Sequence, residues 1–93
     1  MRITYDPGKR ERTLRERGLD FERAEEVFAG LTIDMPDLRR DYDERRINSI
    51  GHLSGRMVIV CLTPRGEARH IISTRKANDR EKARYRKRFE EGR

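Results

Sequence analysis

The stretch RRINSIGHLSGRMVIVCLTPRGEARHIIST, residues 45–74, contains three short runs that alternate in polarity or are rich in β-branched side chains. Such runs, each bounded by turn residues, predict three strands, at 45–53, 56–63 and 68–74. Ser54-Gly55 is a tight-turn signal, and residues 64–67 make the second turn. Parallel strands need long crossovers, so these short turns predict an antiparallel β-sheet meander.

The middle strand is apolar on both of its faces. Side chains alternate across a strand, so one face carries Met57, Ile59 and Cys61 and the other carries Val58, Val60 and Leu62. Two apolar faces are typical of a central strand that is covered on both sides.

Upstream of these strands, the chain predicts a short strand at residues 2–5 and then a helix. Asp6-Pro7 is a helix start, because Asp can accept the free amide hydrogen bonds and proline fits the first helical position. Gly18 is a good C-terminal breaker for this helix.

A second helix is expected after Asp20, which can cap it, and before Gly30. Its apolar residues fall on one helix face, which predicts a buried stripe: Phe21, Ala24, Val27 and Phe28. Residues 31–35 predict a short strand or extended link. Residues 36–43 contain a proline, three aspartates and no apolar period, which predicts an exposed loop.

A basic helix is expected at the C-terminal end. Asn78 can cap it, with Glu81 as the capping-box partner, and Tyr85 and Phe89 can share a docking face. The order of elements predicts an α+β fold, an antiparallel sheet with two N-terminal helices and this basic helix. No repeat or linker divides the chain, so residues 1–93 are expected to form a single domain.

Positive charge is concentrated at the two ends of the sequence. The net charge is +6 overall. Residues 1–17 hold six Arg/Lys and three Asp/Glu, and residues 75–93 hold nine and four. A polyanion such as a nucleic acid is the natural partner for such ends. The alternative is a basic helix that only keeps the protein soluble.

Several classes of protein are disfavoured. Cys61 is the only cysteine, so no internal disulfide is possible, and its apolar surroundings predict a buried small side chain. No apolar stretch is long enough to span a membrane and no signal peptide is visible, so a cytoplasmic protein is expected. No zinc spacing or glycine-rich phosphate loop is present, so neither a metal site nor a cofactor is predicted.

Arginines beside the predicted strands are the remaining chemical signal. Arg46 should share a strand face with Asn48, Ile50 and His52, and Arg75 stands at the end of the last strand. The planar guanidinium donates two parallel hydrogen bonds and stays charged, which suits phosphate. The alternative is that these arginines cover strand edges or pair with loop aspartates.

A series of residues stands in a fixed order along the chain: Tyr5-Asp6, Lys9, Gly18, Phe21, Ala24, Val27-Phe28, Arg46, Ile50-Gly51, the run IISTRKA at 71–77, Arg80-Glu81 and Tyr85. This ordered set resembles the BrnT family, toxins of type II toxin–antitoxin systems with a RelE/ParE-like fold. The resemblance spans residues 2 to about 89, and the IISTRKA run followed by Arg-Glu and Tyr is its most specific part.

The resemblance implies a metal-independent endoribonuclease that blocks translation. It also implies a BrnA-like antitoxin partner with a ribbon-helix-helix DNA-binding domain, a toxin–antitoxin heterotetramer, and contact with operator DNA only through the antitoxin. The sequence departs from the family pattern at four positions, with Tyr5 in place of Trp, Thr13 in place of Asn, Arg17 in place of His and His70 in place of Arg.

Metal-free RNA cleavage needs phosphate-binding cations and groups that move protons to and from the reacting oxygens. Arg46 and Arg75 are the expected phosphate ligands. His70 suits acid–base work by its ordinary pKa, although regular alternation places it on the face opposite Arg75. Glu81 and Tyr85 are alternative proton-transfer groups, unless they only cap and dock the last helix.

Further cations are expected to bind RNA: Lys9, Arg69, Lys76 and Arg80. Two other functions stay open. One is a basic RNA- or DNA-binding module without catalysis, which predicts salt-sensitive binding and no change in RNA length. The other is a co-repressor subunit whose toxicity has decayed, in line with the four departures.

Overall fold

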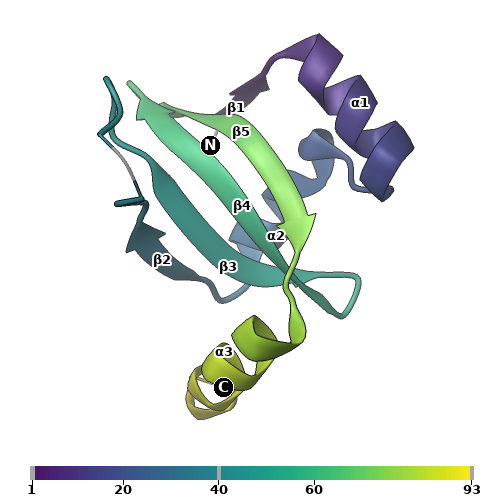
Figure 1. The fold of residues 1–93 in the computed structure, drawn as a ribbon, viewed down its shortest axis with the longest axis vertical. Helices are drawn as coiled ribbons and strands as arrows, with labels where there is room; N and C mark the ends of the chain where they lie inside the picture. The colour runs from purple at the N-terminus through teal and green to yellow at the C-terminus, as the bar shows by residue number, and fades with distance from the viewer. Residues whose placement is uncertain (1, 40, 93) are drawn as a thin grey trace.

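The computed structural model describes residues 2–39 and 41–92. The elements, in chain order, are β1 (Arg2–Tyr5), α1 (Pro7–Arg17), a 3₁₀ turn (Phe21–Arg23), α2 (Ala24–Ala29), β2 (Ile33–Pro36), β3 (Ile47–Leu53), β4 (Arg56–Arg65), β5 (Ala68–Lys76) and α3 (Asp79–Glu91). Figure 1 shows α2 behind a twisted sheet, α1 beside the β1–β5 side of it, and α3 at the lower end. The predicted α+β class is confirmed.

The five strands form one mixed sheet in the order β1-β5-β4-β3-β2. β3, β4 and β5 make the predicted antiparallel meander, and β2 joins it antiparallel to β3. β1 runs parallel to β5, so the prediction of a purely antiparallel sheet is wrong. The turn argument applies only to strands joined by hairpins, whereas the long connection from β1 to β5 allows parallel pairing.

β4 occupies the middle of the sheet, and both of its faces are covered, as predicted. On the face toward α2, Val58, Val60 and Leu62 pack with Phe21, Val27 and Ile71. On the other face, Met57 and Ile59 pack with Ile33, Ile50, Tyr85 and Phe89. Since Tyr85 and Phe89 belong to α3, this helix covers the half of the second face nearest the β3–β4 turn.

Helix α1 begins and ends where the sequence predicts. Asp6 accepts a hydrogen bond from the Gly8 amide, and Gly18 closes the helix with a left-handed φ of 70°. Asp20 caps the next helical segment as predicted, but its first turn is a 3₁₀ turn and α2 begins only at Ala24. The predicted single second helix is therefore two short helical pieces.

Three strand boundaries differ from those predicted. β3 begins at Ile47, not at residue 45, β5 continues through Lys76, and β4 continues through Pro64 to Arg65. The β3–β4 pairing stops at Leu62, so Pro64 has no β3 partner for which it would need a backbone N–H. The strand can therefore pass through a proline that the sequence places in a turn.

β5 contains one more residue than the part of β4 that it faces. Leu62 pairs with Ile71 and Cys61 pairs with Ser73, so Ile72 has no partner in β4. This β-bulge shifts the alternation of side chains by one position along β5.

The bulge decides which face His70 occupies. His70 pairs with Thr63, and Arg75 pairs with Ile59. Thr63 and Ile59 are four residues apart on one strand and therefore share a face. His70 and Arg75 consequently lie on the same face of the sheet, which regular alternation would not allow.

Candidate functional site

Small polar side chains occupy the part of the second sheet face that α3 leaves uncovered. Cys61 pairs with Asn48 on β3 and with Ser73 on β5, and Thr63 is the next residue along this face of β4. We call Asn48, Cys61, Thr63 and Ser73 the floor. Cys61 is a buried free cysteine, as predicted, and burial raises the pKa of its thiol. The thiol thus behaves as a small side chain and not as a nucleophile.

Arg46 lies at the β3 side of the floor. Its guanidinium stacks on the Tyr42 ring, with 4.0 Å between its Cζ and the ring centroid. Its charge acts on the Cys61 thiol, which places the two groups close together. The Arg46 Nε is buried and makes no hydrogen bond to any residue within 2–39 and 41–92. A buried donor without a partner is costly, which makes Arg46 an exceptional position in this structure.

Most of the described residues of the loop predicted at 36–43 are exposed, as expected. Residue 40 lies outside the described residues, but Pro36 belongs to β2 and Asp37 is only 5% exposed. Arg39 donates two hydrogen bonds to the Asp37 carboxylate, at 2.9 and 2.8 Å, and holds its pKa at about 2. A carboxylate can be buried when it is fully paired, and the sequence pattern does not reveal such a pairing.

Arg39 adds a cation that the sequence did not single out. It acts electrostatically on both Arg75 and the Cys61 thiol. At the Cys61 thiol the opposite effect of Asp37 is larger, so the positive charge of Arg39 acts chiefly beside Arg75. Loop arginines are usually solvated, so the sequence alone does not indicate that Arg39 acts on residues of the sheet.

Arg75 is held at the opposite end of the floor by Glu81, at the start of α3. The two side chains form a bidentate pair at 2.7 and 2.8 Å. Glu81 also accepts from the Asn78 amide and completes the predicted capping box. Hydrogen bonding to Arg75 lowers the pKa of Glu81 to about 2. Glu81 is thus ionised near neutral pH and positions Arg75, and it has no proton to donate there.

His70 lies at the β1 side of the floor. Its Nδ1 is 2.8 Å from the Thr4 Oγ1 of β1. Burial and then the nearby Arg65 lower the pKa of His70, so the imidazole is neutral near pH 7. Lys9 on α1 also acts electrostatically on this ring. A neutral imidazole beside cations can accept a proton.

Arg46, His70 and Arg75 stand around the floor from three sides. Thr63 donates a 2.6 Å hydrogen bond to the carbonyl of Arg45, which places Arg46 beside Thr63, and His70 pairs with Thr63 from the other strand. Two strand spacings amount to ~10 Å between the Arg46 and His70 backbones. Arg75 follows two residues after the floor residue Ser73. The side chains of Arg46, His70 and Arg75 thus border one face of the sheet.

A family model described as the BrnT ribonuclease toxin of type II toxin–antitoxin systems matches residues 5–81. The chain belongs to the BrnT family. No curated protein matches it significantly. The part matched to the BrnT family contains Arg46, His70, Arg75 and Glu81, and it ends before Tyr85.

Tyr85 lies in the core and not at the floor. Its ring is 8% exposed and packs with the second cluster, and its hydroxyl donates to the Met35 sulfur at 3.3 Å. Of the two interpretations of Tyr85, docking of α3 therefore fits the geometry. A proton-transfer role does not.

The four other predicted RNA-binding cations are dispersed. Arg69 stacks on Phe28, 4.5 Å from Cζ to ring centroid, on the sheet face opposite the floor. Lys76 and Arg80 are exposed at the end of β5 and the start of α3. Lys9 is the member of this set that acts on a floor-side residue, His70.

Arg17 approaches the site from α1. Its Nη1 donates a 3.0 Å hydrogen bond to the carbonyl of Thr74, next to Arg75. β1 pairs with β5 only as far as Ile71, so beyond that point α1 lies along the β5 edge. Arg17 was not chosen from the sequence, because helix position alone does not reveal a contact with a strand.

Two kinds of feature are absent from residues 2–39 and 41–92. No group of three or more His, Cys, Asp or Glu side chains is placed to hold a metal ion there. None of the helices in that part of the chain is long and apolar enough to cross a bilayer.

Proposed function

We propose that this chain is a metal-independent endoribonuclease that cleaves RNA at the floor, with the 2′-hydroxyl as nucleophile. The observation that carries the proposal is the convergence of Arg46, His70 and Arg75 around one patch of small side chains. Membership of a ribonuclease toxin family supports RNA as the substrate.

Arg46 and Arg75 bind the scissile phosphate and stabilise the charge that builds up on it. Stacking on the Tyr42 ring holds the Arg46 guanidinium in place before RNA binds. Glu81 holds Arg75 in position, and the charge of Arg39 adds to the positive electrostatic potential near Arg75. Lys76 lies one residue beyond Arg75 and contributes to RNA binding.

His70 removes the proton from the 2′-hydroxyl. Its lowered pKa keeps the ring neutral near pH 7, and in the tautomer whose Nδ1–H is donated to the Thr4 hydroxyl, the Nε2 lone pair is free to take the proton. The 2′-oxygen attacks phosphorus, the bond to the 5′-oxygen breaks, and a 2′,3′-cyclic phosphate forms. Lys9, which reaches the same region from α1, donates the proton that the 5′-oxygen takes up.

The biological role follows from the family. A ribonuclease toxin of a type II system acts on RNA and is neutralised by a protein antitoxin. The chain then inhibits translation and growth in the cytoplasm. A BrnA-like ribbon-helix-helix antitoxin completes a heterotetramer and carries the contacts to operator DNA. The RelE/ParE-like relationship of the fold belongs to the same proposal.

The test replaces the phosphate ligands one at a time. Arg46→Ala and Arg75→Ala should each lower RNA cleavage in EDTA by about a hundredfold, because each removes transition-state charge stabilisation. Arg15→Ala is the matched control, since Arg15 is exposed on α1 away from the floor. Undiminished cleavage by both variants would refute the phosphate role, and loss of wild-type cleavage in EDTA would refute metal independence.

A second function, RNA binding without cleavage, is favoured by one observation. The Arg75 guanidinium is already occupied by a bidentate carboxylate, which offsets its charge. In that case RNA of unchanged length should be recovered while binding weakens steeply with salt. The cleavage assay above separates the two functions directly.

A further inference from the structure

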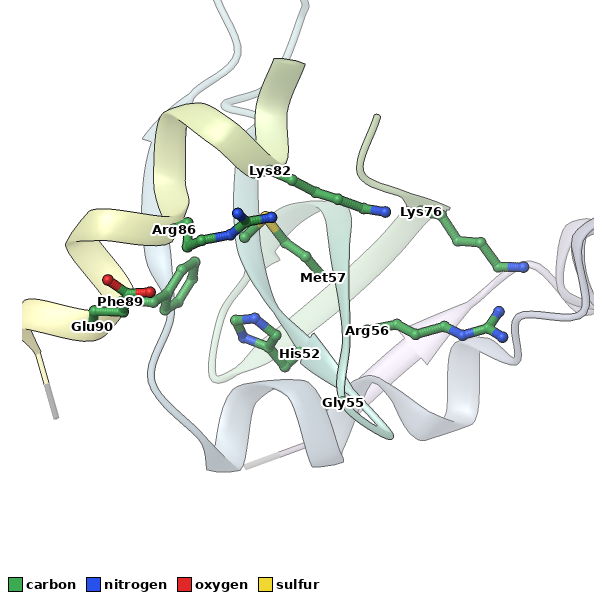
Figure 2. A pocket seen from close by; sticks show the side chains of 9 residues that line it. All are labelled: His52, Gly55, Arg56, Met57, Lys76, Lys82, Arg86, Phe89 and Glu90. Atoms are coloured by element: carbon green, nitrogen blue, oxygen red, sulfur yellow. The ribbon is translucent and has the colours of Figure 1, made fainter. Parts of the chain in front are cut away.

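A second concave site lies on the other flank of α3. It is a groove of about 480 Å³ between α3 and the β3–β4 hairpin. Figure 2 shows its lining: His52, Gly55, Arg56, Met57, Lys76, Lys82, Arg86, Phe89 and Glu90. The proposed ribonuclease site shares only Lys76 with this groove, since neither Arg75 nor Glu81, which fixes it, is among the lining residues.

The groove is strongly cationic. Arg56, Lys76, Lys82 and Arg86 line it, against a single carboxylate from Glu90. Among the described residues, Arg56, Lys76 and Arg86 make no ion pair, and Lys82 has only a 4.0 Å pair with the fully exposed Asp79. In Figure 2 the Lys82 side chain extends toward Lys76, and the Arg86 side chain lies over Met57. These charges are available to an anionic ligand.

The base of this groove is apolar. Met57 and Phe89 are buried, at 8% and 5% exposure. His52 packs against the Phe89 ring in a T-shaped contact, with 4.6 Å between centroids and 81° between the planes. Sites for single-stranded nucleic acid combine cations with aromatic faces on which successive bases stack. The lining has four cations but only one aromatic ring that is not fully buried, His52, which favours carboxylates and an aliphatic side chain over a run of stacked bases.

We propose that this groove binds an acidic segment of the protein antitoxin. Carboxylates of that segment pair with the cations of the hairpin and α3, and an apolar side chain covers Met57. We choose an acidic segment as the occupant because its negative charge is complementary to the positive charge of the groove. The proposal rests on the proposed function for the existence of an antitoxin, but its test measures binding and needs no ribonuclease activity.

Segment binding would act on the ribonuclease site through α3. The helix carries Lys82 and Arg86, which line the groove, and Glu81, which fixes Arg75. A partner that holds or moves α3 therefore changes the position of a phosphate ligand without covering the floor.

The test uses the full chain with two fluorescein-labelled probes, a Glu-Leu repeat peptide and an oligouridylate. Lys82→Glu/Arg86→Glu should weaken peptide binding by about tenfold or more, because two attractive charges become repulsive. The matched control is Arg84→Glu/Arg88→Glu, which reverses two exposed charges at the same spacing outside the groove and should change binding by less than about twofold. Circular dichroism checks that both variants fold.

Perturbation of the His52 and Met57 NMR signals by the peptide should locate the bound segment. Equal weakening by the two double variants, or no peptide binding by the wild type, would overturn the proposal. So would an oligouridylate that perturbs the same signals and binds more tightly than the peptide, since nucleic acid would then be the occupant. Failure of RNA cleavage in the separate assay would count against the ribonuclease site alone.

Discussion

The two faces of the part of the sheet formed by β3, β4 and β5 differ in the side chains that cover them. The face toward α2 is closed by large apolar side chains, among them Val58, Val60 and Ile71, which are all fully buried. The face toward α3 is closed in the same way only near the β3–β4 turn. Beyond that point it carries the small polar floor, ringed by charged side chains.

Because of this difference, we expect one face to determine the stability of the fold and the other face to determine ligand binding and catalysis. The closed face contains side chains whose removal opens cavities, so it determines whether the chain folds. The floor contains side chains that contribute little apolar burial, so they can be selected for what they present to a ligand. The comparison predicts large stability effects on one face and large activity effects with small stability effects on the other.

The largest expected effect comes from the closed face. Ile71→Ala should lower the free energy of unfolding by about 2–5 kcal/mol, because it leaves a cavity at a fully buried site. Ser73→Ala, two residues away on the floor face, should cost less than about 1 kcal/mol. Urea unfolding of both variants measures the difference. Equal losses would erase the distinction between the faces.

An intermediate effect is expected at the β1 side of the floor. His70→Gln should lower cleavage by about a hundredfold or more, as expected for loss of a general base. In the wild type, the rate should rise with pH as the imidazole loses its proton and level off below neutrality, because burial lowers the pKa of His70. The pH–rate profile of the variant should lack this acid limb.

Thr4→Val tests whether the ring must be held in place. It removes the hydrogen bond to Nδ1 and should reduce the rate while leaving the acid limb in the profile. A His70→Gln variant that keeps both its rate and its acid limb would contradict the base assignment. The two variants together separate proton transfer from positioning.

The smallest expected effect is at the α3 side. Glu81→Gln keeps an oxygen for the capping box but loses the charge that pairs with Arg75, and should cost about 1 kcal/mol near neutral pH. The folded pKa of Glu81, about 2, lies below its ordinary value. Its contribution is therefore present above the ordinary carboxyl pKa and is lost as the pH falls toward 2.

Urea unfolding of wild type and Glu81→Gln between about pH 6 and about pH 3 measures this contribution, since the difference should shrink on acidification. Glu16→Gln, at an exposed position of α1, is the control for loss of one carboxylate. A difference that stays constant or grows as the pH falls would exclude the Arg75–Glu81 pair as its source.

Local patterns predicted much of the fold. Asp6, Gly18 and Asn78 act at helix ends as their side chains and dihedral preferences require, and the two-sided apolar pattern of β4 marks the centre of the sheet. Each of these signals depends on a few neighbouring residues. The parallel pairing of β1 with β5 joins residues far apart in the chain, and no local signal reports it.

The candidate site was only partly predictable for a related reason. Arg46, His70 and Arg75 could be chosen by residue type, but their common face depends on the bulge at Ile72, and IISTR reads as a regular strand. Arg17 contacts the Thr74 carbonyl from a helix and Arg39 acts on Arg75 from a loop, and neither tertiary placement is present in the sequence pattern. The sequence therefore indicates which side chains have suitable chemistry, but it does not indicate how they are arranged in space.

The β1–β5 pairing has a consequence for synthesis. Arg2 lies opposite Ala68, so the sheet cannot be completed until the chain beyond β4 has left the ribosome. Contacts between residues this far apart also slow folding, because a long loop must close first. Thr4 and His70 thus come together only after translation of most of the chain.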